Sequence, residues 1–140
     1  MLNPFLHLQI LAFLALAGMS LSEAAAKPQV PDLTKGGRSD GLHDWNLGPT
    51  GARGWIWGWN LETTDSRQIL ITSVSAGSPA DGVLQKGDVI VGVDGRPFTV
   101  DARKSFGAAV TAAETAEKGG TLAVLRWRAG TTEEVSLQLP

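Results

Sequence analysis

The sequence contains no cysteine among its 140 residues. This absence excludes disulfide bridges, zinc sites built on thiolates, a cysteine nucleophile and the lipid-bearing cysteine of a bacterial lipoprotein. With neither cross-links nor a thiolate metal site available, we expect the fold to be stabilised by packing alone.

Histidine is almost as scarce, since His7 and His43 are the only two in the sequence. His7 falls within an apolar leader, so a histidine-based metal site would lack further ligands. His43 directly precedes Asp44, and adjacent residues seldom face one another as a catalytic triad requires. The sequence around Ser78, Gly-Ser-Pro, is not the nucleophile elbow GxSxG, and the motifs GxGxxG and the P-loop are absent. We therefore expect no catalytic residue, no cofactor and no metal site, and the protein is not predicted to be an enzyme.

Clustered positive charge is missing as well. The 12 lysines and arginines and the 14 aspartates and glutamates are scattered along the chain, whereas nucleic-acid surfaces gather basic residues into a patch or stripe. Nucleic acid is therefore not expected as a partner.

Residues 1–26 have the pattern of a secretory signal peptide. An apolar stretch runs from Leu2 to Gly18 and is followed by the small-residue run Ala24, Ala25 and Ala26. The segment before the apolar core lacks lysine and arginine, which leaves an uncleaved membrane anchor as the alternative. We expect an exported protein, periplasmic or secreted, with membrane attachment only if the leader stays uncleaved.

Two further regions follow the leader. Residues 27–41 mix proline, glycine, serine and charge without an apolar period, which predicts a flexible linker. Residues 42–140 carry the regular patterns of one folded domain, because a chain of this length supports a single core.

The pattern of residues 42–140 predicts an α+β fold. Alternation and β-branched residues indicate strands, Ser78-Pro79 opens a short helix, and Asp101 is the N-cap of a longer helix that ends near Gly119. The expected sheet is small, curved and antiparallel, a partly open barrel capped by the two helices. The expected strands are residues 54–59, 69–74, 89–93, 121–127 and 133–139.

The stretch GSPADGVLQKGDVIVGVDGRPF, residues 77–98, resembles the most recognisable segment of PDZ domains. Gly87 permits a turn there, Asp88 can accept hydrogen bonds from nearby backbone amides, and the pair Asp94-Gly95 suits a turn with positive φ angles. The resemblance covers roughly residues 45–139. The closing hairpin is similar to the bacterial exported type that is attached to periplasmic serine proteases.

The resemblance implies a loop of sequence x-Φ-G-Φ that holds the carboxylate at the end of a peptide ligand. The preferred frame runs from Ala52 to Trp55, with Arg53 in place of the first apolar residue and Gly54 as the glycine. The alternative frame, residues 56–59, fits the letters better but lies closer to the next strand. The glycines would let backbone N–H groups converge on an anion, and Arg53 could add a charged contact.

The same resemblance implies a groove between a strand edge and the longer helix, in which an extended peptide adds a strand to the sheet. The helix register leaves open whether Arg103 or Ala102 stands at its start, and in the second case Phe106 would face the ligand and Val110 would not. The predicted groove residues, beside Arg53 and Gly54, are Trp55, Ile56, Trp57, Phe106 and Val110.

These patterns predict a peptide-binding module that recognises the C-termini or extended segments of other exported proteins. One alternative is the regulatory N-terminal domain of a larger exported enzyme or other long secreted protein. A second alternative is carbohydrate binding, because four of the five tryptophans fall between residues 45 and 59 and could form a stacking platform. Packing in the core or the groove is the competing explanation for the tryptophans.

Overall fold

The computed structural model describes residues 26–140. Nearly all of the predicted leader therefore lies outside the described residues, and its cleavage stays a prediction. Within residues 26–140, no helix combines the length and the apolar character needed to cross a membrane.

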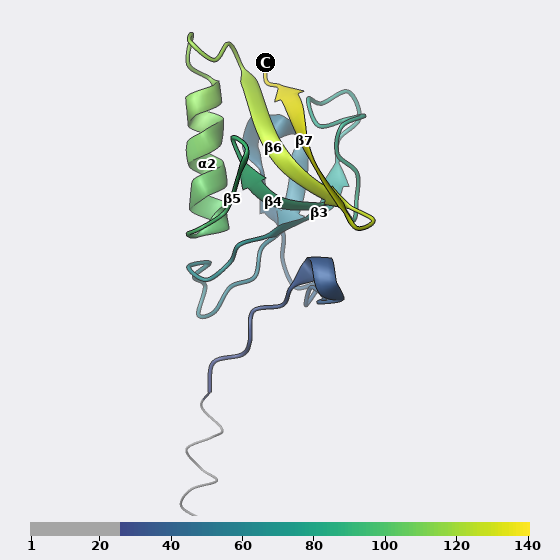
Figure 1. The fold of residues 1–140 in the computed structure, drawn as a ribbon, viewed down its shortest axis with the longest axis vertical. Coiled ribbons are helices and arrows are strands. Elements are labelled where there is room, and N and C mark those ends of the chain that lie inside the picture. Colours follow the sequence, from purple (N-terminus) through teal and green to yellow (C-terminus); the bar gives the residue numbers. More distant parts are fainter. Residues whose placement is uncertain (1–25) are drawn as a thin grey trace, which may run out of the picture.

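Seven strands form one antiparallel sheet in the order β1-β2-β3-β4-β6-β7, with β5 paired to β4 alone. The single α-helix of the described residues, α2, packs against β4 and β6 (Figure 1). The strands are β1 (Trp45–Asn46), β2 (Ala52–Trp55), β3 (Ile69–Val74), β4 (Val89–Val93), β5 (Arg96–Pro97), β6 (Thr121–Arg128) and β7 (Thr131–Gln138); α2 spans Ala102–Ala113, and two 3-10 turns, η1 and η2, span Leu33–Lys35 and Gly48–Thr50.

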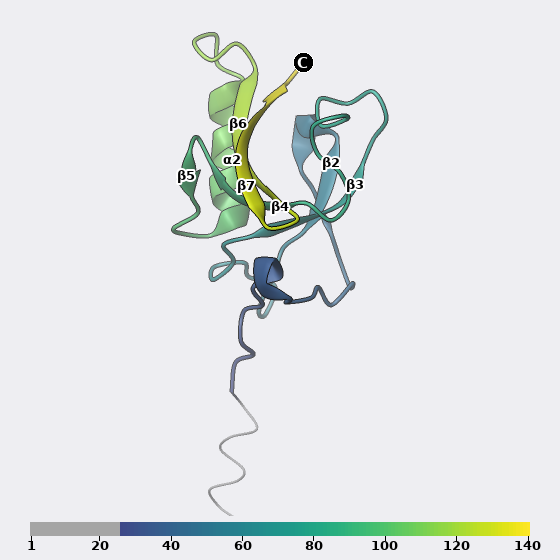
Figure 2. The same ribbon diagram turned by 45° about the vertical axis from the view of Figure 1, so that its right-hand side comes forward.

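The closing hairpin is the longest element of the sheet. All eight residues of β6 pair with β7, from Thr121 opposite Gln138 to Arg128 opposite Thr131. The hairpin is strongly curved along its length, as Figure 2 shows. Along β6, Leu122 and Val124 are buried and alternate with more exposed neighbours, because successive side chains of a strand point to opposite faces.

The helix α2 begins where the sequence provides a cap. The carboxylate of Asp101 accepts hydrogen bonds from the backbone N–H groups of Arg103 at 3.0 Å and Lys104 at 3.3 Å. The buried face of α2 repeats at helical spacing and closes the core against the sheet. Its buried residues are Ala102, Phe106, Ala109, Val110 and Ala113.

The α+β class predicted from the sequence is confirmed, with two differences in detail. The expected short helix at residues 78–84 is a series of turns, in which Gly82 has a φ of +78° that does not continue a right-handed helix. The expected strand at residues 54–59 is also shorter, because β2 ends at Trp55 and a separate turn follows.

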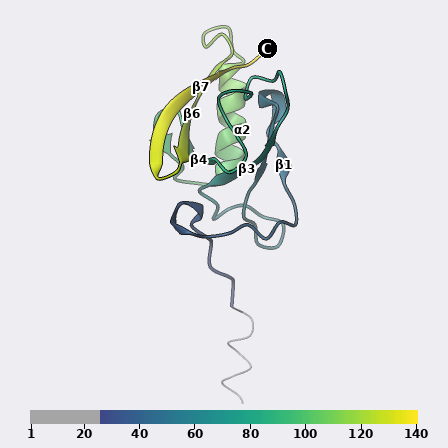
Figure 3. The same ribbon diagram turned by 90° about the vertical axis from the view of Figure 1, so that its right-hand side faces the viewer.

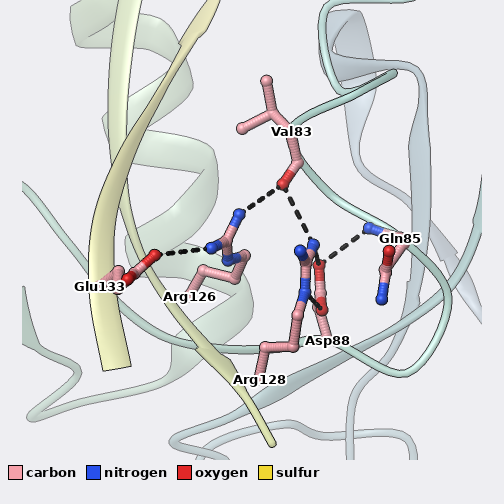
Figure 4. A network of polar contacts seen from close by, with 6 residues as sticks. All are labelled: Val83, Gln85, Asp88, Arg126, Arg128 and Glu133. Atoms are coloured by element: carbon pink, nitrogen blue, oxygen red, sulfur yellow. Dashed lines mark hydrogen bonds and ion pairs between the residues drawn. The ribbon is translucent and has the colours of Figure 1, made fainter. Parts of the chain in front are cut away.

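A half-buried ion pair joins the closing hairpin to the turn before β4 (Figure 4). Asp88 is 1 % exposed, and its carboxylate accepts hydrogen bonds from Arg128 Nε at 2.7 Å and Arg128 Nη2 at 2.8 Å. It also accepts one from the backbone N–H of Gln85 at 2.8 Å, as the sequence predicted. The pairing raises the pKa of the Arg128 guanidinium above its ordinary value. This bidentate contact holds two segments 40 residues apart in the sequence.

The segment before β1, which the sequence predicted as a flexible linker over residues 27–41, lies against the domain. Figures 1 and 2 place it, with η1, at the end of the molecule away from the C-terminus. Asp32 accepts a hydrogen bond from the side chain of Gln68 at 2.9 Å, and Asp40 accepts one from Trp55 Nε1 at 2.6 Å. Lys27 pairs with Asp65. Composition alone could not reveal these contacts, because their partners lie far along the chain.

Candidate functional site

The short strand β1 lies on the edge of β2 that faces away from β3. Trp45 stands opposite Gly54 and Asn46 opposite Arg53, and the N–H of Leu47 donates to the carbonyl of Ala52 at 3.0 Å. Because β3 occupies the other edge of β2, both edges of β2 are paired within the chain. An added strand would therefore find an open edge on β1.

The glycine-rich loop between β1 and β2 uses its backbone donors internally. The N–H of Gly48 donates to Asn46 Oδ1 at 2.9 Å, and the N–H of Ala52 donates to Thr50 Oγ1 at 3.1 Å. The N–H of Gly51 donates to the carbonyl of Gly48 at 3.3 Å. The nest expected from these glycines thus has donors that bond inside the loop and do not converge on an anion.

An apolar groove with a volume of about 300 Å³ lies between β1 and α2. Figure 3 shows β1 to one side of the helix, with the β6–β7 hairpin on the other side. Residues 45–48 form one wall and Ile56 contributes between the two walls. The helix wall repeats every three or four residues, which places its members on one face; they are Arg103, Phe106, Gly107 and Val110.

A polar cluster around Thr63 borders one end of the groove. The guanidinium of Arg103 lies over the ring of Trp45, 4.7 Å from its centroid, and Arg103 Nε donates to Thr63 Oγ1 at 3.2 Å. The same hydroxyl lies 2.8 Å from a carboxylate oxygen of Asp101 and donates to it. The contacts tie the start of α2 to β1, so the groove has a fixed width at this end.

Three of the seven predicted binding residues line this groove, namely Ile56, Phe106 and Val110. Of the two helix registers left open, the structure has Arg103 at the groove and Ala102 fully buried in the core. Phe106 and Val110 both face the groove in this register.

The other four predicted residues do not line it. Arg53 is exposed, and its Nη2 pairs with Asp44 Oδ1 at 2.9 Å. The hydrogen bonds from Arg53 and then from Thr72 hold the pKa of Asp44 below its ordinary value of 3.8, and the same pair raises the pKa of Arg53. Arg53 therefore already has an ion-pair partner, and it is not among the residues that line the groove.

The remaining three predicted residues have roles in packing, and they are Gly54, Trp55 and Trp57. A β carbon on Gly54 would lie 2.5 Å from Ile69 Cγ2 and 3.2 Å from Leu47 Cδ1, so only glycine fits between β1 and β3. Trp55 is 4 % exposed, and Trp57 lines a separate cavity beneath the N-terminal segment.

The family model of the PDZ domain matches residues 49–122. The chain belongs to the PDZ domain family. The match spans the loop after β1, the strands β2 to β5, the helix α2 and the start of β6. No curated protein matches the chain.

As a PDZ domain, the matched part of the chain is a module that binds peptides or proteins. Among residues 26–140, no cluster of three or more histidine, aspartate or glutamate side chains is placed to hold a metal ion. Within the same range, Trp59 is the one exposed tryptophan of the five, so the indoles do not form a row of open rings.

Sequence reasoning missed the strand-side wall of the groove. It assigned this wall to Trp55 and Trp57, whereas the structure forms it from Trp45, Asn46 and Leu47. The available signal was the Leu-Gly-Pro-Thr-Gly sequence of residues 47–51, which marks a tight connection between two short extended segments.

Proposed function

We propose that this PDZ domain binds extended peptide segments in the groove between β1 and α2. The observation that carries the proposal is the groove itself, an apolar slot of about 300 Å³ bounded by a strand on one side and a helix on the other. A peptide there pairs its main chain with the outer edge of β1 and places an apolar side chain against Phe106 and Val110.

The chemistry of the walls favours an apolar side chain with a polar neighbour. Phe106 and Val110 are buried residues whose remaining surface faces the slot, and Gly107 leaves space between them because it has no side chain. Arg103 supplies positive charge at the end that borders Thr63. The main-chain pairing contributes affinity for any extended segment, whereas these pockets discriminate between side chains.

Internal segments are favoured over free C-termini as ligands. The N–H groups of Gly48, Gly51 and Ala52 already have acceptors, and the Arg53 guanidinium is paired with Asp44. A peptide carboxylate would therefore have to replace existing hydrogen bonds. Calorimetry with matched peptide acids and amides tests this point: equal affinity supports recognition of extended segments, and a clear preference for the acid supports carboxylate capture.

The exported location is part of the proposal. Its support is the leader pattern of residues 1–26 together with the β6–β7 hairpin, which resembles that of the bacterial exported type. The intact mass of the protein recovered from its producing cell decides the matter. A mature chain that begins near Lys27 supports export with cleavage, and a chain that still begins at Met1 in the membrane fraction indicates an anchor.

Filling the groove tests the binding site directly. Gly107 is helical, and a β carbon there meets no atom within 4 Å, so Gly107→Leu adds bulk to the slot without a clash. Helix propensity also improves with this change. We expect unchanged or higher stability and loss of peptide binding. The matched control is Ala108→Leu, on the exposed neighbouring position, which should leave binding intact. Full binding by the Gly107→Leu chain would place the peptide elsewhere.

A further inference from the structure

Four two-residue turns in the described chain have positive φ angles at both central positions, as in type I′ turns. Three of them end in glycine, at Gly95, Gly120 and Gly130, with φ angles of +74°, +85° and +88°. The fourth has Asn60 at +50° and Leu61 at +64°. Glycine is the favoured residue at this second position, because a β carbon is strained there. Leu61 therefore occupies the position at which the other three turns have glycine.

The strained leucine is also one of the most exposed apolar side chains. Leu61 is 87 % exposed, Leu42 is 82 % exposed and Trp59, which opens the same turn, is 38 % exposed. Leu42 and Leu61 border a cavity of about 120 Å³ that has Trp45 and Ile56 in its lining. Strain combined with exposure at one place points to a role in binding, since neither feature stabilises the fold.

This cavity, which we call the Leu42–Leu61 pocket, continues the groove. Trp45 and Ile56 line both hollows, so the two lie next to each other, and the contact of Arg103 with Thr63 lies where they meet. The pocket borders on the segment before β1 and on the turn of residues 59–62, and the groove borders on α2. One extended ligand can therefore place one side chain in each.

The charged groups that are free to pair at the rim of the pocket are carboxylates, whereas Arg103 is engaged with Thr63 and Trp45 of the lining. Asp40 lines it, and Glu62 follows Leu61 in the turn. Among the described residues neither carboxylate takes part in an ion pair, and no lysine or arginine lines the pocket. A ligand that carries lysine or arginine next to its apolar side chain complements this rim, whereas an anionic lipid surface is repelled by it.

We propose that the Leu42–Leu61 pocket is a second side-chain site, which takes an apolar residue flanked by a basic residue from the same extended peptide that occupies the groove. This inference rests on the proposed function, and it defines the ligand class as a two-anchor peptide. Leu61 acts as an apolar lip that covers the second anchor, and Asp40 and Glu62 pair with the adjacent basic side chain.

The test is a selection from a displayed library of random twelve-residue peptides on the wild-type chain and on three variants. Leu61→Gly creates an Asn-Gly turn, so the melting temperature should be unchanged or higher while the apolar lip is lost. We expect the wild type to enrich peptides with two apolar positions and a basic residue beside one of them. On the Leu61→Gly chain the second anchor should disappear, with affinity for two-anchor peptides about tenfold weaker.

Two further variants serve as controls. Val100→Ser removes another exposed apolar side chain that lies outside the pocket lining, and selection should match the wild type. Asp40→Asn keeps an oxygen for the hydrogen bond from Trp55 Nε1 but removes the charge, so the basic preference should weaken while both apolar anchors remain.

The outcomes separate this inference from the proposed function. Single-anchor peptides on both the wild type and Leu61→Gly would overturn the second site and leave the groove in place. No enrichment on any chain would overturn both. Two other results would also overturn the proposal, if Leu61→Gly abolished them without changing the selected peptides. Binding to zwitterionic or anionic vesicles would assign Leu61 to contact with a lipid surface. Self-association in sedimentation would assign it to contact with a second copy of the chain.

Discussion

The guanidinium of Arg103 stacks on the indole of Trp45, with the central carbon 4.7 Å from the ring centroid. Arg103 is in the first turn of α2, and Trp45 begins β1. The stack thus joins the two walls of the binding groove. Since Arg103 also donates to the buried hydroxyl of Thr63, its position is fixed from two directions.

A double-mutant cycle measures this contact. Arg103→Met keeps the apolar stem but removes the charge, and Trp45→Leu removes the ring. Cation–π pairs of this kind contribute about 0.5–1 kcal/mol when partly exposed, so the free energies of unfolding in urea should be non-additive by about that amount. Additive effects would mean that the stack does not tie β1 to α2.

The conformation of the turn between β4 and β5 predicts a backbone effect. Gly95 has a φ of +74°, and a β carbon there would meet only Glu134 Oε2, at 3.9 Å. Gly95→Val should therefore lower stability through backbone strain and not through a clash, by about 1–3 kcal/mol. Gly95→Asn is the control, because asparagine tolerates this φ, and it should cost clearly less in thermal unfolding. Equal losses of stability for both variants would mean that backbone strain at positive φ does not explain the effect of Gly95→Val.

Asp88 and Arg128 predict a larger loss of stability. Asp88→Ala leaves the N–H of Gln85 and the guanidinium of Arg128 without their shared acceptor, which should cost about 3 kcal/mol or more because Asp88 is buried. Glu133→Gln is the matched control. Its partner is Arg126, and Glu133 is mostly exposed, so urea unfolding should change by less than about 1 kcal/mol. A small loss for Asp88→Ala would show that this ion pair contributes little to holding the hairpin.

Acid should loosen the segment before β1. Hydrogen bonds from Gln68 lower the pKa of Asp32, and those from Arg53 and then Thr72 lower the pKa of Asp44. A folded pKa below the ordinary 3.8 means that the stabilisation is complete above about pH 3.8 and is lost as the pH falls below it. The NMR signals of the Gln68 side-chain amide should therefore shift below pH 3.8. Asp32→Asn should abolish that titration, and a shift that persists in the variant would have another origin.

Much of the fold could be predicted because its signals are local. The β-branched runs gave β3 and β4 with their observed bounds, and Asp101 marked the start of α2. The helix wall of the groove followed from the same helical period, since Phe106 and Val110 are one turn apart.

The strand wall could not be predicted, because its signal is not local. A two-residue strand has no periodicity, and the pairing of Trp45 with Gly54 depends on a loop whose conformation no pattern defines. The contacts of the preceding segment, such as Asp32 with Gln68, are likewise set by tertiary packing. Consequently the sequence placed Arg53 at the ligand, whereas the structure pairs it with Asp44.

A reversible cross-link between β1 and β2 decides which edge a peptide uses. Asn46 and Arg53 stand opposite each other, and the hydrogen bond from Leu47 to Ala52 makes them a non-hydrogen-bonded pair, in which Cα atoms lie about 4.5 Å apart. That separation suits a disulfide. The chain has no other cysteine, so the double variant Asn46→Cys and Arg53→Cys forms one defined bridge.

If the peptide pairs with the outer edge of β1, the oxidised and reduced forms should bind it with the same affinity, within about twofold, because the bridge leaves that edge open. Comparing two redox states of one protein cancels the loss of the Arg53–Asp44 pair, which is absent in both. Calorimetry on peptides selected by the wild type provides the measurement. Binding that vanishes on oxidation and returns on reduction would mean that the ligand displaces β1 and pairs with β2 itself. In that case β1 would cover the binding edge of β2 in the unbound protein.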